Sequence, residues 1–510
     1  MRKNFTKLFP FAAASVALAS CQTQTESTPN ERPNILFVFV DDLGFADVGF
    51  NGSTYYETPT IDSVAAQSLI FQNSYTYPTS SPSRTALFTG QQSFRTGVYN
   101  VPALEKGSAN ESIFSRWTVS TDYPFYSEQL AKAGYESIHL GKWHVVGPYP
   151  DLENSLEFPL TEPLKQPAAG DYSWVARHKE GDIKMKYYPE GRGFLKNVGG
   201  SFKGDPAYEE GGYKSYTGGY RAPLSNPFIE KKDSDEWLTD RLTDDAIEFM
   251  QEHKDGPFFV NLHYYTVHRP VVSRSDELLE KYMNKEGDEK LGQGVGEGKR
   301  KEDIAAYATM VESLDDNFGK LVNFLKDNGL DKNTIIVFSS DNGYNVGGNN
   351  LLRSKKRSIY EGGVRVPTFV HWPEHVNARR TDVPIHILDY FPTFLDMAGI
   401  NNYNGILDGK SLTPLFMGDT PELKERPIFW QLNSVGLDGT CTAMRQGKYK
   451  LIQFLATGNV ELYDLEADPK ETTNIATDRA DVAEKMLSEM KQWRATNNVP
   501  LPPNAIVDNK

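Results

Sequence analysis

The sequence predicts an α/β protein with a large, mostly parallel sheet sandwiched by helices and a smaller C-terminal antiparallel-sheet subdomain. Two observations predict this class. Apolar, β-rich runs alternate with helical patterns between residues 34 and 397, and from Pro427 short strands follow one another across turns. The length of 510 residues allows more than one domain. We therefore expect a main domain at 33–420 and a C-terminal subdomain at 421–510.

The run NILFVFV at 34–40 is continuously apolar, which is typical of a strand buried on both faces. Apolar runs of this kind predict the other strands of the main domain, and apolar residues at helical spacing predict its helices. Predicted helices lie at 62–71, 83–89, 127–133, 237–254, 301–328 and 385–397, and further strands at 136–140, 257–264, 334–340 and 366–372.

Two segments lack this alternation. Residues 145–235 are rich in Gly, Pro and Tyr, which predicts loops laid over one end of the sheet. Residues 284–301 are rich in Gly and charge, which predicts an exposed connection. The C-terminal subdomain is predicted to contain strands at 428–432, 442–445, 449–454 and 460–463 and a closing helix at 482–494.

Composition narrows the possible partners. The net charge of −14 argues against nucleic acid, because binding phosphates requires a basic face. It leaves an anionic substrate open, since a local group of cations and a metal can outweigh the global field.

The N-terminus reads as a targeting segment. A positively charged start and an apolar run at 8–18 predict a signal peptide. The sequence Leu18-Ala19-Ser20-Cys21 resembles a bacterial lipobox, which implies a signal at 1–21, lipidation of Cys21 and a flexible linker at 22–32. The expectation is an exported bacterial lipoprotein, facing the periplasm or at the cell surface and held to the membrane by its lipid anchor only. An ordinary cleaved signal peptide with a chance cysteine is the alternative.

A short motif begins at Ser80. Pro82 suits the first turn of a helix that Gly90 ends, so Ser80 is predicted just before a helix N-terminus, where negative charge is favoured. Arg84 adds a cation able to fork two hydrogen bonds to an oxyanion. A hydroxyl at such a position is a candidate nucleophile. A Ser-rich turn before a capped surface helix is the simpler reading of the first five residues.

The longer string SSPSRTALFTG, from Ser80 to Gly90, resembles the signature of the formylglycine-dependent type I sulfatases. The resemblance implies an alkaline-phosphatase-like fold. It also implies that Ser80 is oxidised to formylglycine, whose hydrated aldehyde is the nucleophile. A serine at this position is similar to the serine-type subclass, which implies a radical-SAM maturation enzyme as a partner.

Oxygen ligands follow two predicted strands. Asp41 and Asp42 come after the first strand, and Asp341 and Asn342 come after the strand at 334–340. Sites in open α/β sheets lie beyond the carboxyl ends of strands, and these oxygens suit calcium or magnesium. The positions also match the metal ligands of the sulfatase family, together with the formylglycine oxygen from Ser80. The resemblance implies Ca²⁺.

Gly141-Lys142-Trp143-His144 follows the predicted strand at 136–140 and resembles a second sulfatase motif. The resemblance implies that Lys142 holds the nucleophile's hydroxyl and the sulfate, and that His144 takes the proton that regenerates the aldehyde. A lone histidine beside a tryptophan would otherwise be read as a hydrogen-bonded structural residue.

Two further residues come from the same resemblance. His268, just after the strand at 257–264, corresponds to the histidine that donates a proton to the leaving alcohol, whereas His263 lies inside that strand and is expected to be packed. Lys356 opens a block that resembles the family's Lys…Tyr-Glu-Gly-Gly-x-Arg-x-Pro and would contact the sulfate. Lys355 and Arg357 flank Lys356, so a shift of one residue stays open.

The reading that joins these motifs is a hydrolase of sulfate esters on a carbohydrate, such as a sulfated polysaccharide or glycan fragment. Arg84, Lys142, Lys356 and calcium would neutralise the developing oxyanion charge. One alternative is a metal-dependent phosphatase or phosphodiesterase of the same superfamily that uses an unmodified serine. Another is a non-catalytic lipoprotein that binds sulfated glycans. The sugar and the position of its sulfate stay open.

Overall fold

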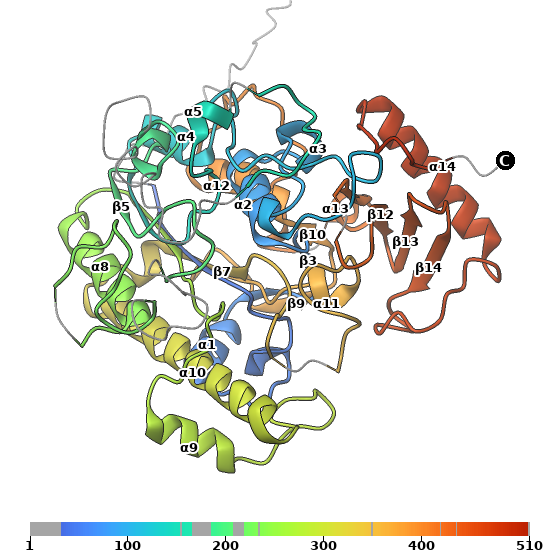
Figure 1. Cartoon of the computed structure of the whole chain (residues 1–510). Coiled ribbons are helices and arrows are strands. Elements are labelled where there is room, and N and C mark those ends of the chain that lie inside the picture. Colours follow the sequence, from blue (N-terminus) through green and yellow to red (C-terminus); the bar gives the residue numbers. More distant parts are fainter. Residues whose placement is uncertain are drawn as a thin grey trace, which may run out of the picture.

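The computed structural model describes residues 32–153, 156–165, 185–207, 219–232, 235–347, 350–418, 420–434 and 436–507. The predictions for Cys21 and for the signal peptide lie outside these residues. Figure 1 shows a main α/β body and, beside it, a small sheet covered by one helix at the C-terminal end of the chain.

The main sheet has eight strands in the order β5-β4-β6-β1-β7-β8-β2-β9. Neighbouring strands are parallel except where β8 pairs with β7 and with β2. The bounds are β1 Asn34–Val40, β2 Leu69–Phe71, β4 Glu136–Gly141, β5 Lys196–Val198, β6 Phe258–His263, β7 Thr334–Ser340, β8 Phe369–His371 and β9 Arg379–Thr381. The predicted fold class, a mostly parallel sheet between helices, is confirmed.

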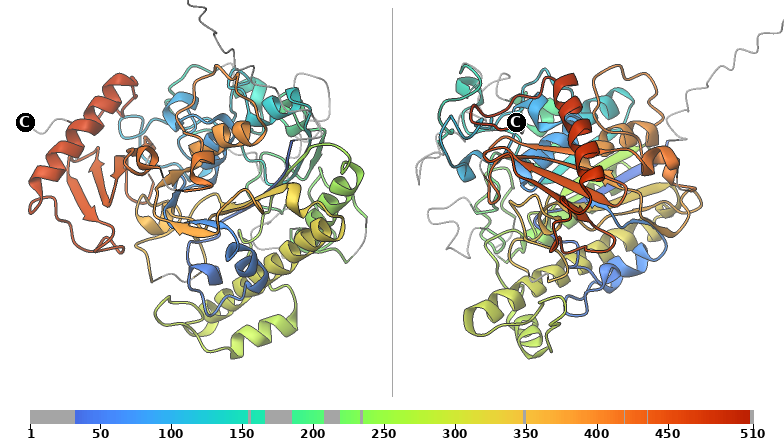
Figure 2. Two further views of the ribbon diagram at one scale, coloured as in Figure 1. Left: turned by 180° about the vertical axis from the view of Figure 1, so that it is seen from behind. Right: turned by 90° about the vertical axis from the view of Figure 1, so that its right-hand side faces the viewer.

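Helices cover both faces of this sheet (Figures 1 and 2). Along β1 the side chains alternate, so Ile35 and Phe37 join one buried cluster and Leu36 and Val38 join the other. The first cluster lies under α2 (Ser80–Thr89), α4 (Tyr126–Lys132) and α12 (Tyr390–Met397), which pack on one another. The second lies under α1 (Pro59–Ala65), α8 (Leu238–Glu252) and α10 (Gly298–Asp327).

The remaining elements are short or peripheral. They are β3 (Ser74–Tyr75) paired with β10 (Ile385–His386), and the helices α3 (Ser93–Thr96), α5 (Pro150–Glu153), α9 (Asp276–Asn284), α11 (Glu361–Val364) and α13 (Pro421–Lys424).

The C-terminal part forms a four-stranded antiparallel sheet, as predicted. Its strands β11 (Ile428–Leu432), β12 (Cys441–Gln446), β13 (Tyr449–Phe454) and β14 (Val460–Asp464) are neighbours in chain order. The helix α14 (Ala480–Thr496) packs on one face through Met486 and Met490. Residues of the other face, such as Trp430 and Ile452, belong to the main buried cluster, so the two sheets share one core.

Two predicted helices are wrong in part. The predicted helix at 62–71 is α1 followed by β2, because residues 69–71 pair with β8 and β9. In the predicted helix at 385–397, the α-helix α12 begins at Tyr390 and is preceded by a 3-10 helix at Ile387–Asp389. Before it, Asp389 accepts the backbone N–H of His386 at 2.8 Å, and Ile385 and His386 pair with β3. Tertiary pairing decides both segments.

Two predicted loops are also corrected. The segment 145–235 was expected to hold loops only, yet it contributes β5 to the edge of the main sheet. The segment 284–301 was expected to be exposed, yet Leu291 and Gln293 are buried and Gln293 donates to the carbonyl of Ala46 at 2.8 Å. None of the helices in the described ranges has the length and apolar character to cross a bilayer.

Candidate functional site

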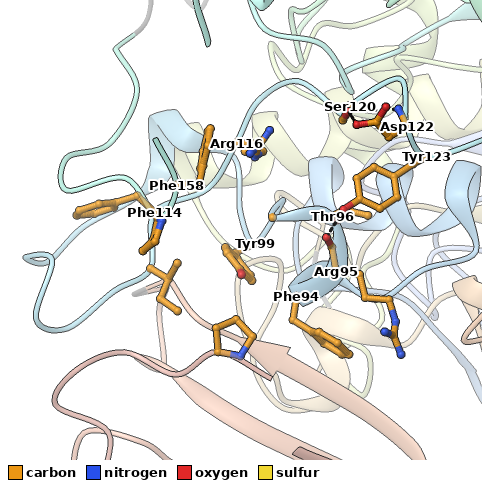
Figure 3. A pocket seen from close by; sticks show the side chains of 14 residues that line it. Phe94, Arg95, Thr96, Tyr99, Phe114, Arg116, Ser120, Asp122, Tyr123 and Phe158 are labelled. Atoms are coloured by element: carbon orange, nitrogen blue, oxygen red, sulfur yellow. Dashed lines mark hydrogen bonds between the residues drawn. The ribbon is translucent and has the colours of Figure 1, made fainter. Parts of the chain in front are cut away.

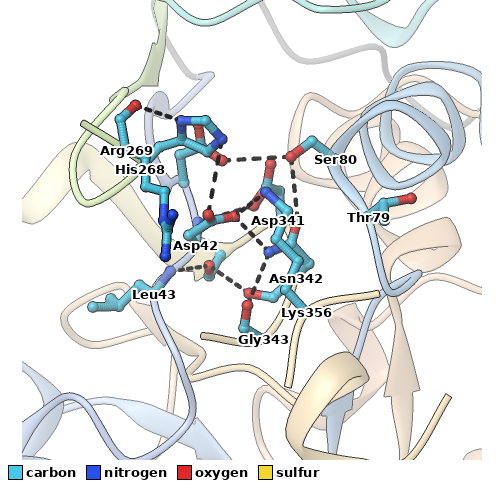
Figure 4. Close-up of polar contacts among 12 residues, drawn as sticks. Asp42, Leu43, Thr79, Ser80, His268, Arg269, Asp341, Asn342, Gly343 and Lys356 are labelled. Atoms are coloured by element: carbon cyan, nitrogen blue, oxygen red, sulfur yellow. Dashed lines mark hydrogen bonds and ion pairs between the residues drawn. The ribbon is translucent and has the colours of Figure 1, made fainter. Parts of the chain in front are cut away.

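The predicted ligands meet at the carboxyl-terminal ends of the central strands β1 and β7 (Figure 4). β1 and β7 are parallel neighbours with Val40 opposite Ser340, so the residues that follow them lie side by side. Asp41, Asp42, Asp341 and Asn342 therefore form one buried group, each 0% exposed. The helix α2 begins at Ser80, earlier than the predicted start at residue 83, with Thr79 as its N-cap.

Ser80 lies inside this group and is only 1% exposed. Its Oγ donates to Oδ1 of Asn342 at 3.1 Å and lies 3.5 Å from Oδ1 of Asp41. The Nζ of Lys142 donates to Ser80 Oγ at 3.2 Å and to Oδ2 of Asp41 at 2.6 Å. One hydroxyl thus touches a carboxylate, an amide oxygen and an ammonium group.

Asp42 connects the second lysine to the group. Its Oδ1 accepts hydrogen bonds from Lys356 Nζ and, at 2.8 Å, from Asn342 Nδ2. The backbone φ of Asp42 is +63°, so the chain turns sharply where β1 ends. Of the three neighbouring cations Lys355, Lys356 and Arg357, it is Lys356, the predicted residue, whose side chain binds Asp42.

Arg84 is buried beneath the group. Its Nε donates to Oδ2 of Asp341 at 3.1 Å, and its Nη1 donates to the carbonyl of Lys142 at 2.9 Å. It also lies 3.0 Å from Nδ1 of His263. These contacts fix Asp341 and the start of the Lys142 loop, so in this structure the guanidinium supports both of them. Its predicted contact with an oxyanion stays a prediction.

Burial and neighbouring charges shift the pKa values of the three carboxylates in different directions. Burial, together with the charge of Asp341, raises the pKa of Asp41 well above its ordinary value. Burial also acts to raise the pKa of Asp42 and of Asp341, but the surrounding cations together outweigh it, with Lys356 first for Asp42 and Arg84 first for Asp341. Both pKa values therefore lie below the ordinary one. The site therefore holds at least two negative charges, matched by the cations around it.

This donor set fits a hard divalent cation. Asp42 Oδ2 is buried and has no hydrogen-bond partner among the described residues. Ligand atoms of Asp41, Asp42 and His268 all lie within 4.8 Å of one another. Carboxylate and amide oxygens are the ligands that Ca²⁺ prefers. The predicted ligands Asp41, Asp42, Ser80, Asp341 and Asn342 are thus brought together, and His268 stands beside them.

His268 points one ring nitrogen at the group and one at the backbone. Its Nδ1 donates to the carbonyl of Arg269 at 2.8 Å, which leaves Nε2 3.9 Å from Oδ2 of Asp42. Burial lowers its pKa to about 3, against the opposing pull of Asp42. The hydroxyl of Tyr220 lies 2.9 Å from the backbone oxygen of His268 and holds this segment in place. His263 is packed, as predicted.

His144 lies at the border of the site, close enough for Lys142 and Arg84 to lower its pKa further after burial. Its backbone φ is +60°, and its N–H donates to the carbonyl of Ser201 at 3.0 Å. Nδ1 of its ring is buried with no hydrogen-bond partner among the described residues. A loop around Gly204 covers the ring.

Sequence reasoning missed this loop and Tyr220. Asp205 is buried in the same loop, and Lys142 is near enough to counteract the rise in its pKa that burial causes. Both residues come from the segment 145–235, where the absence of periodicity left no signal.

Two family models match the chain. One, described as Sulfatase, matches residues 33–400, and one described as N-sulphoglucosamine sulphohydrolase, C-terminal, matches residues 353–496.

Individual relatives agree with these models. A sulfatase from Formosa agariphila is 29% identical over 98% of this chain and 95% of its own length. An N-acetylgalactosamine-6-sulfatase from Mus musculus is 28% identical over 82% of this chain and 71% of its own length. The crystal structure of Ps i-CgsB in complex with k-i-k-neocarrahexaose is 28% identical, has a TM-score of 0.68, and is matched over 94% of this chain and 96% of that one.

Proposed function

The chain belongs to the sulfatase family, and from that premise we propose that it hydrolyses sulfate esters of a carbohydrate with a formylglycine derived from Ser80 and with calcium. The observation that carries the proposal is the hydroxyl of Ser80, which lies between Asn342 Oδ1 and Lys142 Nζ and 3.5 Å from the carboxylate of Asp41. A plain structural serine has no need of such surroundings.

Maturation would oxidise the Ser80 side chain to an aldehyde by removing two hydrogens. The proposed oxidant is a radical-SAM maturation enzyme. The hydrated aldehyde would supply two hydroxyl groups on one carbon, one to attack sulfur and one to release sulfate afterwards. Lys142 is placed to hold the first of them, because its Nζ already donates to Ser80 Oγ.

The cations of the site would hold the sulfate. Lys142 binds Asp41 and Lys356 binds Asp42, and both lysine side chains are at most 7% exposed. In a dry site such charges act strongly on developing negative charge. Arg84 keeps Asp341 in place. Asp41, Asp42, Asp341, Asn342 and the residue at 80 would hold Ca²⁺, which supplies charge that polarises the sulfate oxygens.

Two histidines would carry protons. His268 would give a proton from Nε2 to the leaving sugar oxygen as an imidazolium, because Nδ1 keeps its own proton on the Arg269 carbonyl. The negative charge of a bound sulfate ester would favour this protonated form over the neutral one. His144 would accept a proton at the buried, unpartnered Nδ1 or at Nε2 when the aldehyde forms again.

The carbohydrate substrate is proposed from the names of relatives. One is an N-acetylgalactosamine-6-sulfatase, and the solved structure with 28% identity holds an oligosaccharide. We therefore propose a sulfated glycan, to be identified by sulfate release from a panel that includes N-acetylgalactosamine 6-sulfate and k-i-k-neocarrahexaose.

The first test replaces the nucleophile. Ser80→Ala is expected to abolish sulfate release, whereas Ser81→Ala, the matched control one residue on, keeps most of it. Mass spectrometry of the peptide containing residue 80 should show the loss of two hydrogens in active enzyme. A fully active protein with an unmodified serine, or with alanine at 80, would contradict the proposed nucleophile.

A second test concerns the metal. Chelation is expected to remove activity, and Ca²⁺ is expected to restore it, because the ligands are all oxygens. Dependence on zinc with an unmodified Ser80 would favour a phosphatase instead. Tight binding of sulfated glycans without turnover by matured protein would favour the non-catalytic alternative.

Export as a lipoprotein stays part of the proposal. Cys21→Ala is expected to leave the protein without lipid and to release it from the membrane fraction, as fractionation of the native host would show. Retention in the membrane would contradict lipid anchoring.

A further inference from the structure

A second cavity lies outside the group around Ser80 (Figure 3). Its volume is about 350 Å³, and none of the site residues named above lines it. The walls come from residues 94–123, from Phe158 and Pro159, and from Pro500 near the C-terminal end of the chain. We call it the Arg116 pocket.

Arg116 is a cation of this pocket that interacts with the buried Glu153 only through charge, without a direct ion pair among the described residues. Its guanidinium carbon lies 3.5 Å from the centroid of the Phe158 ring. No hydrogen bond or ion pair of this guanidinium with another described residue is present in the structure. Arg95, in the same pocket, is different, because Asp408 binds it through both Nε and a terminal nitrogen at 2.8 and 2.9 Å.

The backbone and the side-chain stem of Arg116 lie against Gly97. A Cβ on Gly97 would lie 3.3 Å from Cδ of Arg116, and the backbone N–H of Arg116 donates to the Gly97 carbonyl at 2.9 Å. With its face on Phe158, the guanidinium keeps the N–H groups of its edge available. Such a fork matches a sulfate or a carboxylate.

The rest of the wall is largely aromatic, and its polar side chains include Arg95, Ser120 and one acid, Asp122. The rings that line the pocket are those of Phe94, Tyr99, Phe114, Tyr123 and Phe158. Asp122 lies among them and accepts from Ser120 Oγ at 3.0 Å, which leaves further lone pairs on the carboxylate. Aromatic faces bind the C–H face of a sugar, and a carboxylate accepts its hydroxyls.

We propose that the Arg116 pocket binds a sulfated sugar unit of a glycan chain, outside the catalytic site. The ligand class rests on the proposed function, whereas the pocket itself rests on its own residues. One anionic substituent would lie against Arg116, the sugar ring against the partly exposed ring of Tyr123, and hydroxyls against Asp122. The pocket would hold a polymer on the enzyme while the catalytic site works on another unit.

The floor of the pocket is a packed apolar cluster that does not include Arg116. Phe94, Tyr99, Ile113 and Val499 form a small buried cluster, with Trp493 against it. This cluster joins the main domain to the end of α14. Loss of Arg116 therefore leaves the floor intact, and a variant at this position is expected to fold.

The experiment compares Arg116→Met with Lys106→Met, which removes an exposed cation from the same segment. Binding to k-i-k-neocarrahexaose and to chondroitin 6-sulfate is measured by calorimetry on protein that also carries Ser80→Ala, so no turnover interferes. We expect Arg116→Met to weaken binding of at least one probe about tenfold, as for the loss of a charge-assisted hydrogen-bond pair. Lys106→Met should leave it unchanged.

Two further measurements keep the result clear. Phe158→Leu, which removes the ring under the guanidinium, should weaken binding similarly, and chemically desulfated chondroitin should bind equally to the Arg116→Met and parent proteins. In the mature enzyme, Arg116→Met should raise KM for polymer and leave kcat for N-acetylgalactosamine 6-sulfate unchanged. Binding of both probes that is indifferent to Arg116 would overturn the inference and leave the sulfatase proposal standing. If the protein shows no sulfatase activity but its glycan binding depends on Arg116, the sulfatase proposal is overturned and the inference about the pocket stands.

Discussion

Gly204 leaves the ring of His144 almost no freedom. A Cβ at this position would lie 2.7 Å from Cε1 and 2.9 Å from Nε2 of the ring. Gly204→Ala is therefore expected to displace His144 and lower kcat about 10- to 100-fold, the range for a proton acceptor misplaced by about 1 Å. Sulfate-release kinetics and a melting curve check the two effects separately.

The control for this prediction is Gly256→Ala, because a Cβ there meets no atom within 4 Å. It should leave kcat unchanged. If Gly204→Ala turns over substrate like the parent protein, the orientation of His144 is not important for the reaction.

Residues of the site differ in how far the sequence could predict them. Asp41 and Asp341 were predictable, because each follows an apolar run whose strand character is plain and because parallel strands end at one edge. Asp205 and Tyr220 were not, since they reach the site from irregular backbone. Their positions depend on contacts with distant residues, such as that of Tyr220 with the carbonyl of His268.

Elements follow the same rule. β1 and α10 were predicted because burial on both faces and helical periodicity are properties of a single segment. β2 and β10 were taken for helix, because three- and two-residue strands carry too short a pattern. What decides them is pairing with β8, β9 and β3, which no local window contains.

His386 at the end of β10 gives a pH prediction at this scale. It is 3% exposed, and its ring lies between Tyr77 and Trp430 at centroid distances of 5.4 and 5.5 Å. Burial lowers its pKa from 6.5 to about 3, with Arg426 acting in the same direction and Asp389 against it. The unfolded chain therefore takes up a proton at a pH where the folded protein does not.

The sign follows from that difference. The contribution of neutral His386 to stability is present above pH 6.5 and is lost as the pH falls from 6.5 toward 3. His386→Asn does not titrate there. The free energy of unfolding of the parent minus that of His386→Asn should fall by up to about 1.4 kcal/mol per pH unit below 6.5. Urea unfolding at several pH values measures it, and a difference that does not change with pH would contradict the prediction.

At the scale of the molecule, the small sheet is held to the main domain by apolar packing, by an ion triad, and by hydrogen bonds such as the one that Trp430 Nε1 donates to the Thr76 carbonyl at 2.9 Å. Lys450 on β13 is 0% exposed, and its Nζ lies 3.0 Å from Glu361 Oε1 and 3.0 Å from Glu471 Oε1. It also donates to the carbonyl of Ile359 at 2.8 Å. Glu361 belongs to α11, beside the Lys356 loop, so the triad spans the junction next to the functional site.

Lys450→Met should destabilise the protein by about 3–5 kcal/mol, because it leaves two buried carboxylates without their cation. The loss should be visible as a lower urea midpoint and as faster hydrogen exchange in β12 and β13. Lys448→Met, two residues earlier and paired at the surface with Asp464, should change stability little. Adding Glu361→Gln and Glu471→Gln to Lys450→Met removes the unpaired charges and should recover part of the loss. If Lys450→Met alone unfolds like the parent, apolar packing and the hydrogen bonds across the junction hold the two sheets together, and the triad contributes nothing to it.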